Sequence, residues 1–362
     1  MANRVFNFNP GPSTLPLEVL EIVQKEMLDY RGTGMSIIES SHRSAEYEEI
    51  NNSAMALCRE ILGLGDNYHV LFLGGGASTQ FAMIPMNFLA SGRKAAYIDT
   101  GTWSSKAIKE AQLLGEVVLA ASSKEAAYKF IPKMSDIKYP ADAAYLHVTS
   151  NNTIKGTQYH QFPDTGGVPL ICDMSSDIAS RKLDLSGFSL IYAGAQKNLG
   201  PAGVTMVIIR DDMLAKAREG LPTMLSYKTH ATEKSLYNTP PVFGVYIVKL
   251  VLEWIKKHGG LDGIEKINRQ KKDAIYNVMD AHPDYYRGTV EKDSRSWMNI
   301  TLRLPSEDLE KKFIAEAKAA KFIGLKGHRS VGGIRVSLYN ALPLEGARKL
   351  AEFMETFMKK NT

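Results

Sequence analysis

The chain has 362 residues, a formal net charge of +5 and two cysteines. A chain of this length buries about three quarters of the surface that its unfolded form exposes. Cys58 and Cys172 therefore need not form a disulfide, and no ligand spacing predicts a metal site. The charge excess contains no Lys/Arg run, which argues against nucleic acid as a partner and suits small anionic substrates.

The apolar positions indicate a soluble protein. The first ten residues have few apolar positions, which Asn and Pro interrupt, so we expect no signal peptide. No stretch approaches the ~20 consecutive apolar residues of a membrane span, so we expect no membrane partner. Two cysteines that need not pair are typical of the cytoplasm, where we expect the protein to work.

Short apolar runs alternate with helical patterns through the first two thirds of the chain. Helices are expected at 51–62, at 81–89, where Pro85 interrupts the pattern, and at 103–114, which Gly115 stops. Buried strands are expected at 69–73, 95–98, 117–120, 144–148, 169–172, 190–193 and 204–209. This order predicts an α/β fold in which helices sandwich a mostly parallel sheet.

The last third changes character. Helical patterns cover 243–256 and 264–279, an alternating strand covers 297–304, and Ser306 is a good N-cap for the helix that follows. A strand at 334–338 and an amphipathic helix from 344 to 357 complete the pattern. We expect a large domain with an N-terminal arm over residues 1–264, and a small C-terminal α+β domain over 265–362.

A glycine-rich turn, Gly74-Gly75-Gly76, stands between a predicted strand and Ala77-Ser78-Thr79. Glycines allow a ligand to approach the backbone closely, and the N–H groups at the start of the next helix can bind a phosphate. The pattern lacks the spacing of dinucleotide-binding and P-loop motifs. A tight turn without a ligand is the alternative.

Two aspartates follow the predicted strand 169–172. Asp173 stands directly at its carboxyl end, and ligands bind at that edge of open α/β sheets. The alternative is that Asp173 caps the following loop, although Asp177 is the better candidate for capping.

Lys197 follows another buried strand and is surrounded by small residues. Desolvation favours the neutral amine, which is the nucleophile that forms a Schiff base. A phosphate-binding turn, a strand-end acid and a strand-end lysine together match the requirements of pyridoxal phosphate. Asp173 would pair with the protonated ring nitrogen, and Trp103 would stack on the ring, although a core aromatic is the simpler interpretation of Trp103.

Four sequence blocks resemble the phosphoserine aminotransferase family. They are NFNPGPSTLP at 7–16, SSHRS at 40–44, AGAQKNLGPAG at 193–203 and GHRSVGGIRVSLYNAL at 327–342, and the similarity runs from residue 5 to the last helix. The resemblance implies a fold-type-I, pyridoxal-phosphate-dependent aminotransferase that works as a homodimer with sites at the subunit interface. It also implies transfer of the amino group between L-glutamate and 3-phosphohydroxypyruvate, a step of serine biosynthesis. Some bacterial members also serve pyridoxine biosynthesis, through a related 4-phosphohydroxy-L-threonine step.

The resemblance also implies roles for individual residues. The cofactor contacts of the family fall on Ala77, Ser78, Trp103, Thr153, Asp173, Gln196 and Lys197. Asn238 and Thr239 match positions that reach the phosphate from the neighbouring subunit; without the resemblance they would be taken as a turn. Arg335 matches the residue that binds the substrate α-carboxylate, and His42, Arg43, His328 and Arg329 match the cluster for the phosphate or distal carboxylate.

An arginine-rich cluster suits both substrates, because arginine binds phosphate and carboxylate through paired hydrogen bonds, and histidine adds charge beside a dianion. The chain departs from some relatives in two places. Pro10 replaces a serine, which removes one side-chain contact, and Ala77-Ser78-Thr79 replaces a segment with arginine. Phosphate binding should therefore depend more on backbone N–H groups.

Two other functions use some of the same residues. A cysteine desulfurase would need a mobile, exposed cysteine, whereas Cys172 lies in a predicted buried strand and Cys58 in a predicted helix. A phosphometabolite-binding protein without catalysis would use only the glycine turn and the His-Arg pairs.

Overall fold

The computed structural model describes residues 4–362, so part of the segment on which the signal-peptide expectation rests, residues 1–3, lies outside the described residues. Within residues 4–362, no helix is long and apolar enough to cross a membrane.

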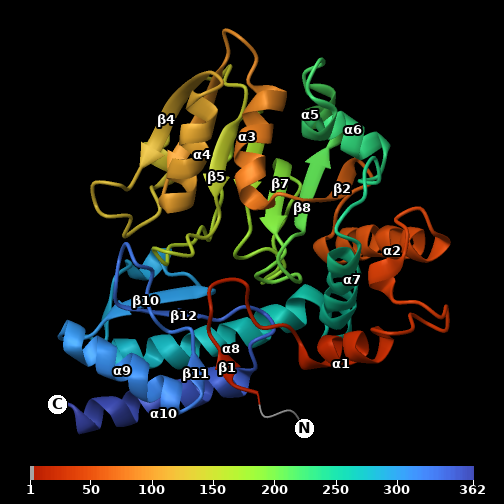
Figure 1. The fold of residues 1–362 in the computed structure, drawn as a ribbon. Coiled ribbons are helices and arrows are strands. Elements are labelled where there is room, and N and C mark those ends of the chain that lie inside the picture. The colour runs from red at the N-terminus through yellow and green to blue at the C-terminus, as the bar shows by residue number, and fades with distance from the viewer. Residues whose placement is uncertain (1–3) are drawn as a thin grey trace.

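A seven-stranded sheet forms the centre of the larger part of the molecule (Figure 1). Its order is β2-β8-β7-β6-β5-β3-β4, and only β8 runs against the other strands. The strands are β2 (Tyr68–Leu73), β3 (Lys94–Asp99), β4 (Glu116–Ser122), β5 (Leu146–Thr149), β6 (Leu170–Asp173), β7 (Phe188–Gly194) and β8 (Thr205–Arg210). All seven overlap the expected apolar runs, and the α/β class with a mostly parallel sheet is confirmed.

Helices cover both faces of this sheet, because successive side chains of each strand point to opposite faces. Val70 and Phe72 of β2 pack in one core with α1, α2 and α7, whereas Leu71 and Leu73 pack in another with α3 and α4. The helices are α1 (Leu17–Glu26), α2 (Ala45–Leu62), α3 (Gly76–Phe88), α4 (Thr102–Gln112), α5 (Asp211–Ala215), α6 (Tyr227–Thr232) and α7 (Val242–Lys257).

A second, smaller layer lies beside the carboxyl ends of the parallel strands (Figure 1). Its antiparallel sheet has the order β12-β10-β9, and β11 pairs with the N-terminal β1. The elements are β1 (Phe6–Asn7), α8 (Gly260–Ala281), β9 (Arg287–Gly288), β10 (Asn299–Arg303), α9 (Glu307–Ala319), β11 (Phe322–Ile323), β12 (Ile334–Ser337) and α10 (Leu344–Lys360). Ser306 caps α9 as expected, because its side chain accepts a bond from Leu309 N–H. The domain division at residue 264 stays a prediction; α8 runs across that position.

Helix α3 differs from the expectation. It begins at Gly76, earlier than expected, and continues through Pro85, so the expected interruption is wrong. Proline removes one helical hydrogen bond, but Pro85 and its neighbours Ile84 and Phe88 are buried against the sheet. The Asn87 side chain also donates to the carbonyl of Met83 at 2.8 Å. Tertiary packing and this bond hold the helix beyond the proline.

Candidate active site

A cavity of about 350 Å³ lies where the parallel strands end, between the large sheet and the small layer. Ligands of open α/β proteins bind at this edge. The cavity is lined by Pro10, Gly11, Gly76, Ala77, Ser78, Trp103, Asn151, Thr153, Ile154, Asp173, Ser175, Ser176, Gln196, Lys197, His328 and Arg335. A larger groove, of about 720 Å³, beside Arg287 and Arg303 contains none of the predicted site residues.

Lys197 lies in the turn after β7, and its Nζ donates to Thr153 Oγ1 at 2.8 Å. Burial lowers the pKa of Lys197 to about 8, and Arg335 adds to this effect, while the carboxylates of Asp173 and Asp177 oppose it. About one amine in ten is then neutral at pH 7, compared with about one in several thousand for a free lysine. The lowered pKa gives Lys197 more of the neutral amine that a Schiff base would need.

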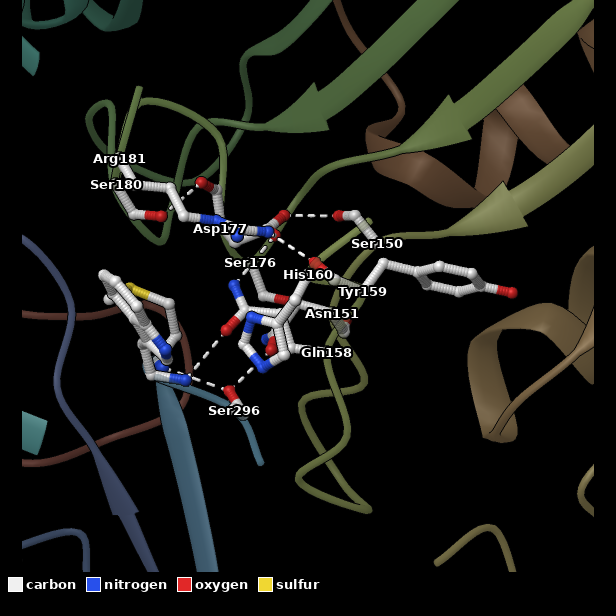
Figure 2. A network of polar contacts seen from close by, with 12 residues as sticks. Ser150, Asn151, Gln158, Tyr159, His160, Ser176, Asp177, Ser180, Arg181 and Ser296 are labelled. Carbon is white, nitrogen blue, oxygen red and sulfur yellow. Dashed lines mark hydrogen bonds and ion pairs between the residues drawn. The ribbon is translucent and has the colours of Figure 1, made fainter. Parts of the chain in front are cut away.

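Asp173 ends β6 and is 5% exposed. Burial raises its pKa, while hydrogen bonding from Ser175 and the charge of Lys197 act in the opposite direction. Ser175 N–H donates to Asp173 Oδ1 at 2.9 Å, so Asp173 does cap the loop that follows. The expectation that Asp177 makes the capping contact is wrong: its carboxylate accepts from Ser150 and Gln158 instead (Figure 2).

The glycine turn brings the start of α3 to the cavity. Gly75 is the N-cap, with a φ of +87°, and a Cβ there would lie 2.0 Å from Thr79 Oγ1. Ala77 and Ser78, in the first turn, line the cavity. The free N–H groups and positive dipole end of a helix start form an anion site. This arrangement fits a phosphate bound mainly by the backbone.

Trp103 stands in the first turn of α4 and faces Lys197. The centroid of its ring lies 5.9 Å from Lys197 Nζ. Its Nε1 is buried and has no hydrogen-bond partner among the described residues. An indole N–H in this condition usually has a partner, so it is suited to a polar ligand in the cavity.

Sequence reasoning missed the contact that the N-terminal arm makes with Lys197. Gly11 has a φ of +133°, and a Cβ on it would lie 3.2 Å from Lys197 Cγ. Ser13 N–H donates to the carbonyl of Gln196 at 2.9 Å, and Ser13 Oγ donates to that of Lys197 at 2.5 Å. The glycine between two prolines, Pro10 and Pro12, was the available signal.

Arg335, on β12, brings a positive charge into the cavity from the small layer. It is 6% exposed, its Nη1 donates to the carbonyl of Thr153 at 3.3 Å, and its Nε has no hydrogen-bond partner in the described part of the chain. No carboxylate forms an ion pair with it within residues 4–362. His328 lines the same cavity, and burial lowers its pKa, with Arg335 and Arg329 adding to the shift. A buried guanidinium without a counter-ion suits an anionic substrate.

The remaining predicted residues do not line the cavity. Arg329 follows His328 but is exposed, and it lines a neighbouring groove. His42 Nδ1 lies 3.2 Å from Thr239 Oγ1, so two of the predicted positions meet on another part of the surface, where Arg43, Asn238 and Thr239 are exposed. One chain thus brings together nine of the predicted residues: Ala77, Ser78, Trp103, Thr153, Asp173, Gln196, Lys197, His328 and Arg335.

The two cysteines are unsuited to catalysis. Both are free and buried, and burial raises the pKa of Cys58 to about 12 and that of Cys172 well above the ordinary value. A desulfurase needs an accessible thiolate. These thiols give no support to that alternative.

Known proteins resemble this chain over its whole length. The model of the class-V aminotransferase family matches residues 5–350. The phosphoserine aminotransferase of Lysinibacillus sphaericus is 55% identical over 361 residues, which cover 100% of both chains. The solved structure of phosphoserine aminotransferase from Bacillus circulans subsp. alkalophilus has a TM-score of 0.98 and 56% identity, covering 100% of each chain.

A more distant structure carries the cofactor. The PLP-bound phosphoserine aminotransferase of Trichomonas vaginalis has a TM-score of 0.92 and 36% identity, and the match covers 97% of this chain and 100% of that one. The chain therefore belongs to the class-V aminotransferase family and, within it, to the phosphoserine aminotransferases.

Proposed function

We propose that this chain catalyses reversible transfer of the amino group between L-glutamate and 3-phosphohydroxypyruvate, giving O-phospho-L-serine and 2-oxoglutarate for serine biosynthesis. The carrying observation is that the amine of Lys197, with its lowered pKa, shares one cavity with the buried carboxylate of Asp173 and the unpaired guanidinium of Arg335. The full-length similarity to phosphoserine aminotransferases supports the choice of substrates.

The cavity fits pyridoxal phosphate in chemistry as well as size. Asp173 would hold the protonated ring nitrogen, the start of α3 at Ala77 and Ser78 would bind the phosphate, and Trp103 would cover the ring. Gln196 and Thr153 line the remaining sides. When bound, the cofactor supplies an electron sink for the charge that develops on the substrate Cα.

Lys197 is the group that moves protons. Its amine, neutral in a substantial fraction of molecules near neutral pH, is able to attach the cofactor and then accept and return the Cα proton of the substrate. Thr153 Oγ1 accepts a hydrogen bond from Nζ at 2.8 Å, which fixes the direction of the amine. The same proton transfer serves both halves of the reaction, first with glutamate and then, reversed, with the phosphorylated keto acid.

Substrate anions would be bound at the edge formed by the small layer. Arg335 would bind the α-carboxylate, because it is buried and has no carboxylate partner among residues 4–362. His328 and Arg329, adjacent in one loop, would bind the phosphate or the distal carboxylate. Arg329 must turn from its exposed position for this role.

We propose that a second copy of the chain completes the site. His42, Arg43, Asn238 and Thr239 lie outside the cavity of their own chain, and a homodimer would bring them to the cavity of the partner. Exposed apolar side chains precede them in the sequence: Ile38, before His42, is 55% exposed, and Tyr237, before Asn238, is 48% exposed. Such residues near one another typically mark an interface.

A half-reaction assay tests the reaction. O-Phosphoserine, serine, aspartate and alanine are each mixed with the yellow holoenzyme, and the cofactor absorbance is followed. We expect rapid conversion with O-phosphoserine and none in the variant Lys197→Ala. Equal rates with serine and O-phosphoserine would contradict the substrate assignment. A colourless protein without a borohydride-reducible imine would instead identify a phosphometabolite-binding protein.

Hybrid dimers test the shared site. Lys197→Ala and Arg43→Ala each inactivate the site in a different way, and mixing them produces dimers with one intact site. Random exchange should restore about a quarter of wild-type activity, because half of the dimers are hybrids and each has one complete site. If the mixture shows only the sum of the residual activities of the two variants, with no recovery on mixing, Arg43 serves the site of its own subunit.

We also propose that the enzyme works in the cytoplasm, where free thiols such as Cys58 and Cys172 remain reduced. The pyridoxine-related reaction with 4-phosphohydroxy-L-threonine stays an expectation, and the half-reaction assay extends to that substrate directly.

A further inference from the structure

A narrow loop, residues 150–159, leaves the carboxyl end of β5 and reaches the cavity. Its base is closed by the bridge between Asn151 and Gln158, and by a 2.7 Å hydrogen bond from Tyr159 N–H to the carbonyl of Ser150. The backbone of the loop is thus paired with itself near the sheet.

The tip of the 150–159 loop carries Thr153. Thr153 Oγ1 accepts from Lys197 Nζ at 2.8 Å, and its carbonyl accepts from Arg335 Nη1 at 3.3 Å. The tip therefore contacts both the amine and the guanidinium that the proposed function uses. Its position decides the surroundings of Lys197.

Asp177 holds the base of this loop from the side of β6 (Figure 2). Its carboxylate accepts a short hydrogen bond from Ser150 Oγ at one oxygen and a 3.0 Å bond from Gln158 Nε2 at the other. The Asp177 side chain is completely buried, and Arg181 Nη2 lies 3.9 Å from it. Ser150 N–H also donates to the carbonyl of Asp173 at 3.0 Å, so the loop and the strand-end acid are held together.

The orientation of the Gln158 amide is set from the small layer. Trp297 N–H donates to Gln158 Oε1 at 2.9 Å, which leaves Nε2 to face Asp177. Gln158 N–H itself donates to the carbonyl of Ser294 at 2.9 Å. Asp177 is therefore the acceptor that this fixed amide requires, because a buried donor without an acceptor is costly.

We propose that Asp177 is a positioning residue of the transamination site, which holds the 150–159 loop so that Thr153 meets Lys197. The inference rests on the proposed function, because it takes Lys197 as the cofactor lysine. Asp177 does not itself line the cavity, and among residues 4–362 its carboxylate contacts Ser150, Gln158 and Arg181 rather than Lys197. It acts through Ser150 and Gln158.

The negative charge of Asp177 has a second effect on Lys197. Three charged groups act on the amine: Asp173 and Asp177 favour its protonated form, and Arg335 disfavours it. Burial raises the pKa of Asp177, while the charges of Arg181 and Lys197 and the hydrogen bonds from Ser150 and Gln158 favour its ionised form. Removing the charge of Asp177 should therefore shift the titration of the amine, or of the imine it forms, to lower pH.

Two substitutions separate position from charge. Asp177→Leu removes both hydrogen-bond acceptors of the carboxylate. Asp177→Asn can keep both contacts, because its amide oxygen can still accept from Gln158 and its amide nitrogen can donate to the Ser150 hydroxyl, which in turn donates to the carbonyl of Asp173. The control is Tyr68→Phe, which removes buried hydrogen bonds to carbonyls such as that of Phe188, far from the cavity. Each holoenzyme is diluted to measure cofactor loss, and its visible absorbance is titrated with pH.

We expect Asp177→Leu to lose pyridoxal phosphate about tenfold faster than wild type or more, since small displacements in a positioned site are costly. Asp177→Asn should stay close to the wild-type rate but show a lower titration midpoint. Tyr68→Phe should change neither, even if its melting temperature falls. If Asp177→Leu does not fold, Gln158→Leu replaces it, with the same faster loss expected.

Wild-type cofactor retention in folded Asp177→Leu or Gln158→Leu overturns the positioning role. An unchanged midpoint in Asp177→Asn overturns the effect of charge. Lys197→Ala is measured in parallel. If Lys197→Ala keeps the visible absorbance of the wild-type holoenzyme, the proposed function is wrong. If Lys197→Ala loses this absorbance but Asp177→Leu retains the cofactor as the wild type does, only the inference about Asp177 is wrong.

Discussion

Lys271 allows a quantitative test of how strongly burial in this structure lowers the pKa of a lysine. It lies on α8, is fully buried, and donates to the carbonyls of Tyr339 at 2.7 Å and Asn340 at 3.3 Å. No carboxylate pairs with it within residues 4–362. Burial lowers the pKa of Lys271 from 10.5 to about 7. The perturbation is Lys271→Met, which keeps the length of the side chain, while Leu342 N–H still donates to the carbonyl of Tyr339 at 2.9 Å.

The sign of the effect follows from proton binding. Between pH 7 and 10.5 the unfolded chain carries a proton on Lys271 and the folded chain does not. The free energy of unfolding of the wild type therefore rises with pH relative to Lys271→Met, by up to about 1.4 kcal/mol per pH unit. The full window corresponds to about 5 kcal/mol, and the difference should be constant below it.

Urea unfolding of the two proteins, compared at steps from pH 6 to pH 10, measures this difference. Every other titrating group, Lys197 included, is present in both proteins and cancels. We expect the difference to change by about 2.5 kcal/mol between pH 7.5 and pH 9.5. A difference that is independent of pH would refute the reasoning, because it would show that Lys271 keeps its proton in the folded chain.

Three further outcomes test the site. The rate at which the apoenzyme captures pyridoxal phosphate should rise with pH through about 8, because burial lowers the pKa of Lys197 to about that value. Stopped-flow absorbance measures this rate. A rate that levels off only near pH 10 would contradict the lowered pKa. Arg329→Leu should raise KM for O-phosphoserine about tenfold or more with an unchanged melting temperature, since a charge-assisted bond is lost; steady-state kinetics with serial substrate concentrations decide. Gly11→Ala should speed cofactor loss, because a φ of +133° disfavours a side chain and the new Cβ would press on Lys197. The control is Gly92→Ala, since Gly92 has a φ of +77° and its Cβ would meet nothing within 4 Å. Equal rates of cofactor loss in both variants would show that the contact between Gly11 and Lys197 does not hold the cofactor.

Local patterns determined the strands and the residues at their ends. Each of the seven sheet strands is a continuous apolar run, and such a run indicates burial on both faces wherever it lies in the chain. Asp173 ends one of these strands and Lys197 lies three residues after the end of another, so their place at the ligand-binding edge follows from the sequence once the strands are parallel.

These local patterns do not determine which strands pair with one another or how the helices pack. The antiparallel direction of β8 and the continuation of α3 through Pro85 depend on contacts between segments far apart in the sequence. The contact of Gly11 with Lys197 joins residues 186 positions apart, and nothing near Gly11 indicates it beyond the two flanking prolines.

The tertiary structure also divided one predicted cluster into two. His328 lines the cavity and Arg329 follows it in the same loop, whereas His42 and Arg43 lie elsewhere, beside Thr239. Likewise, Asp177 resembled a loop cap in the sequence, and its link to Ser150 and Gln158 exists only because β5 and β6 are neighbours in the sheet. Sequence alone determined which chemical groups this protein has at its strand ends. Only the fold decided which of them meet, because distances between loops depend on how the strands are paired.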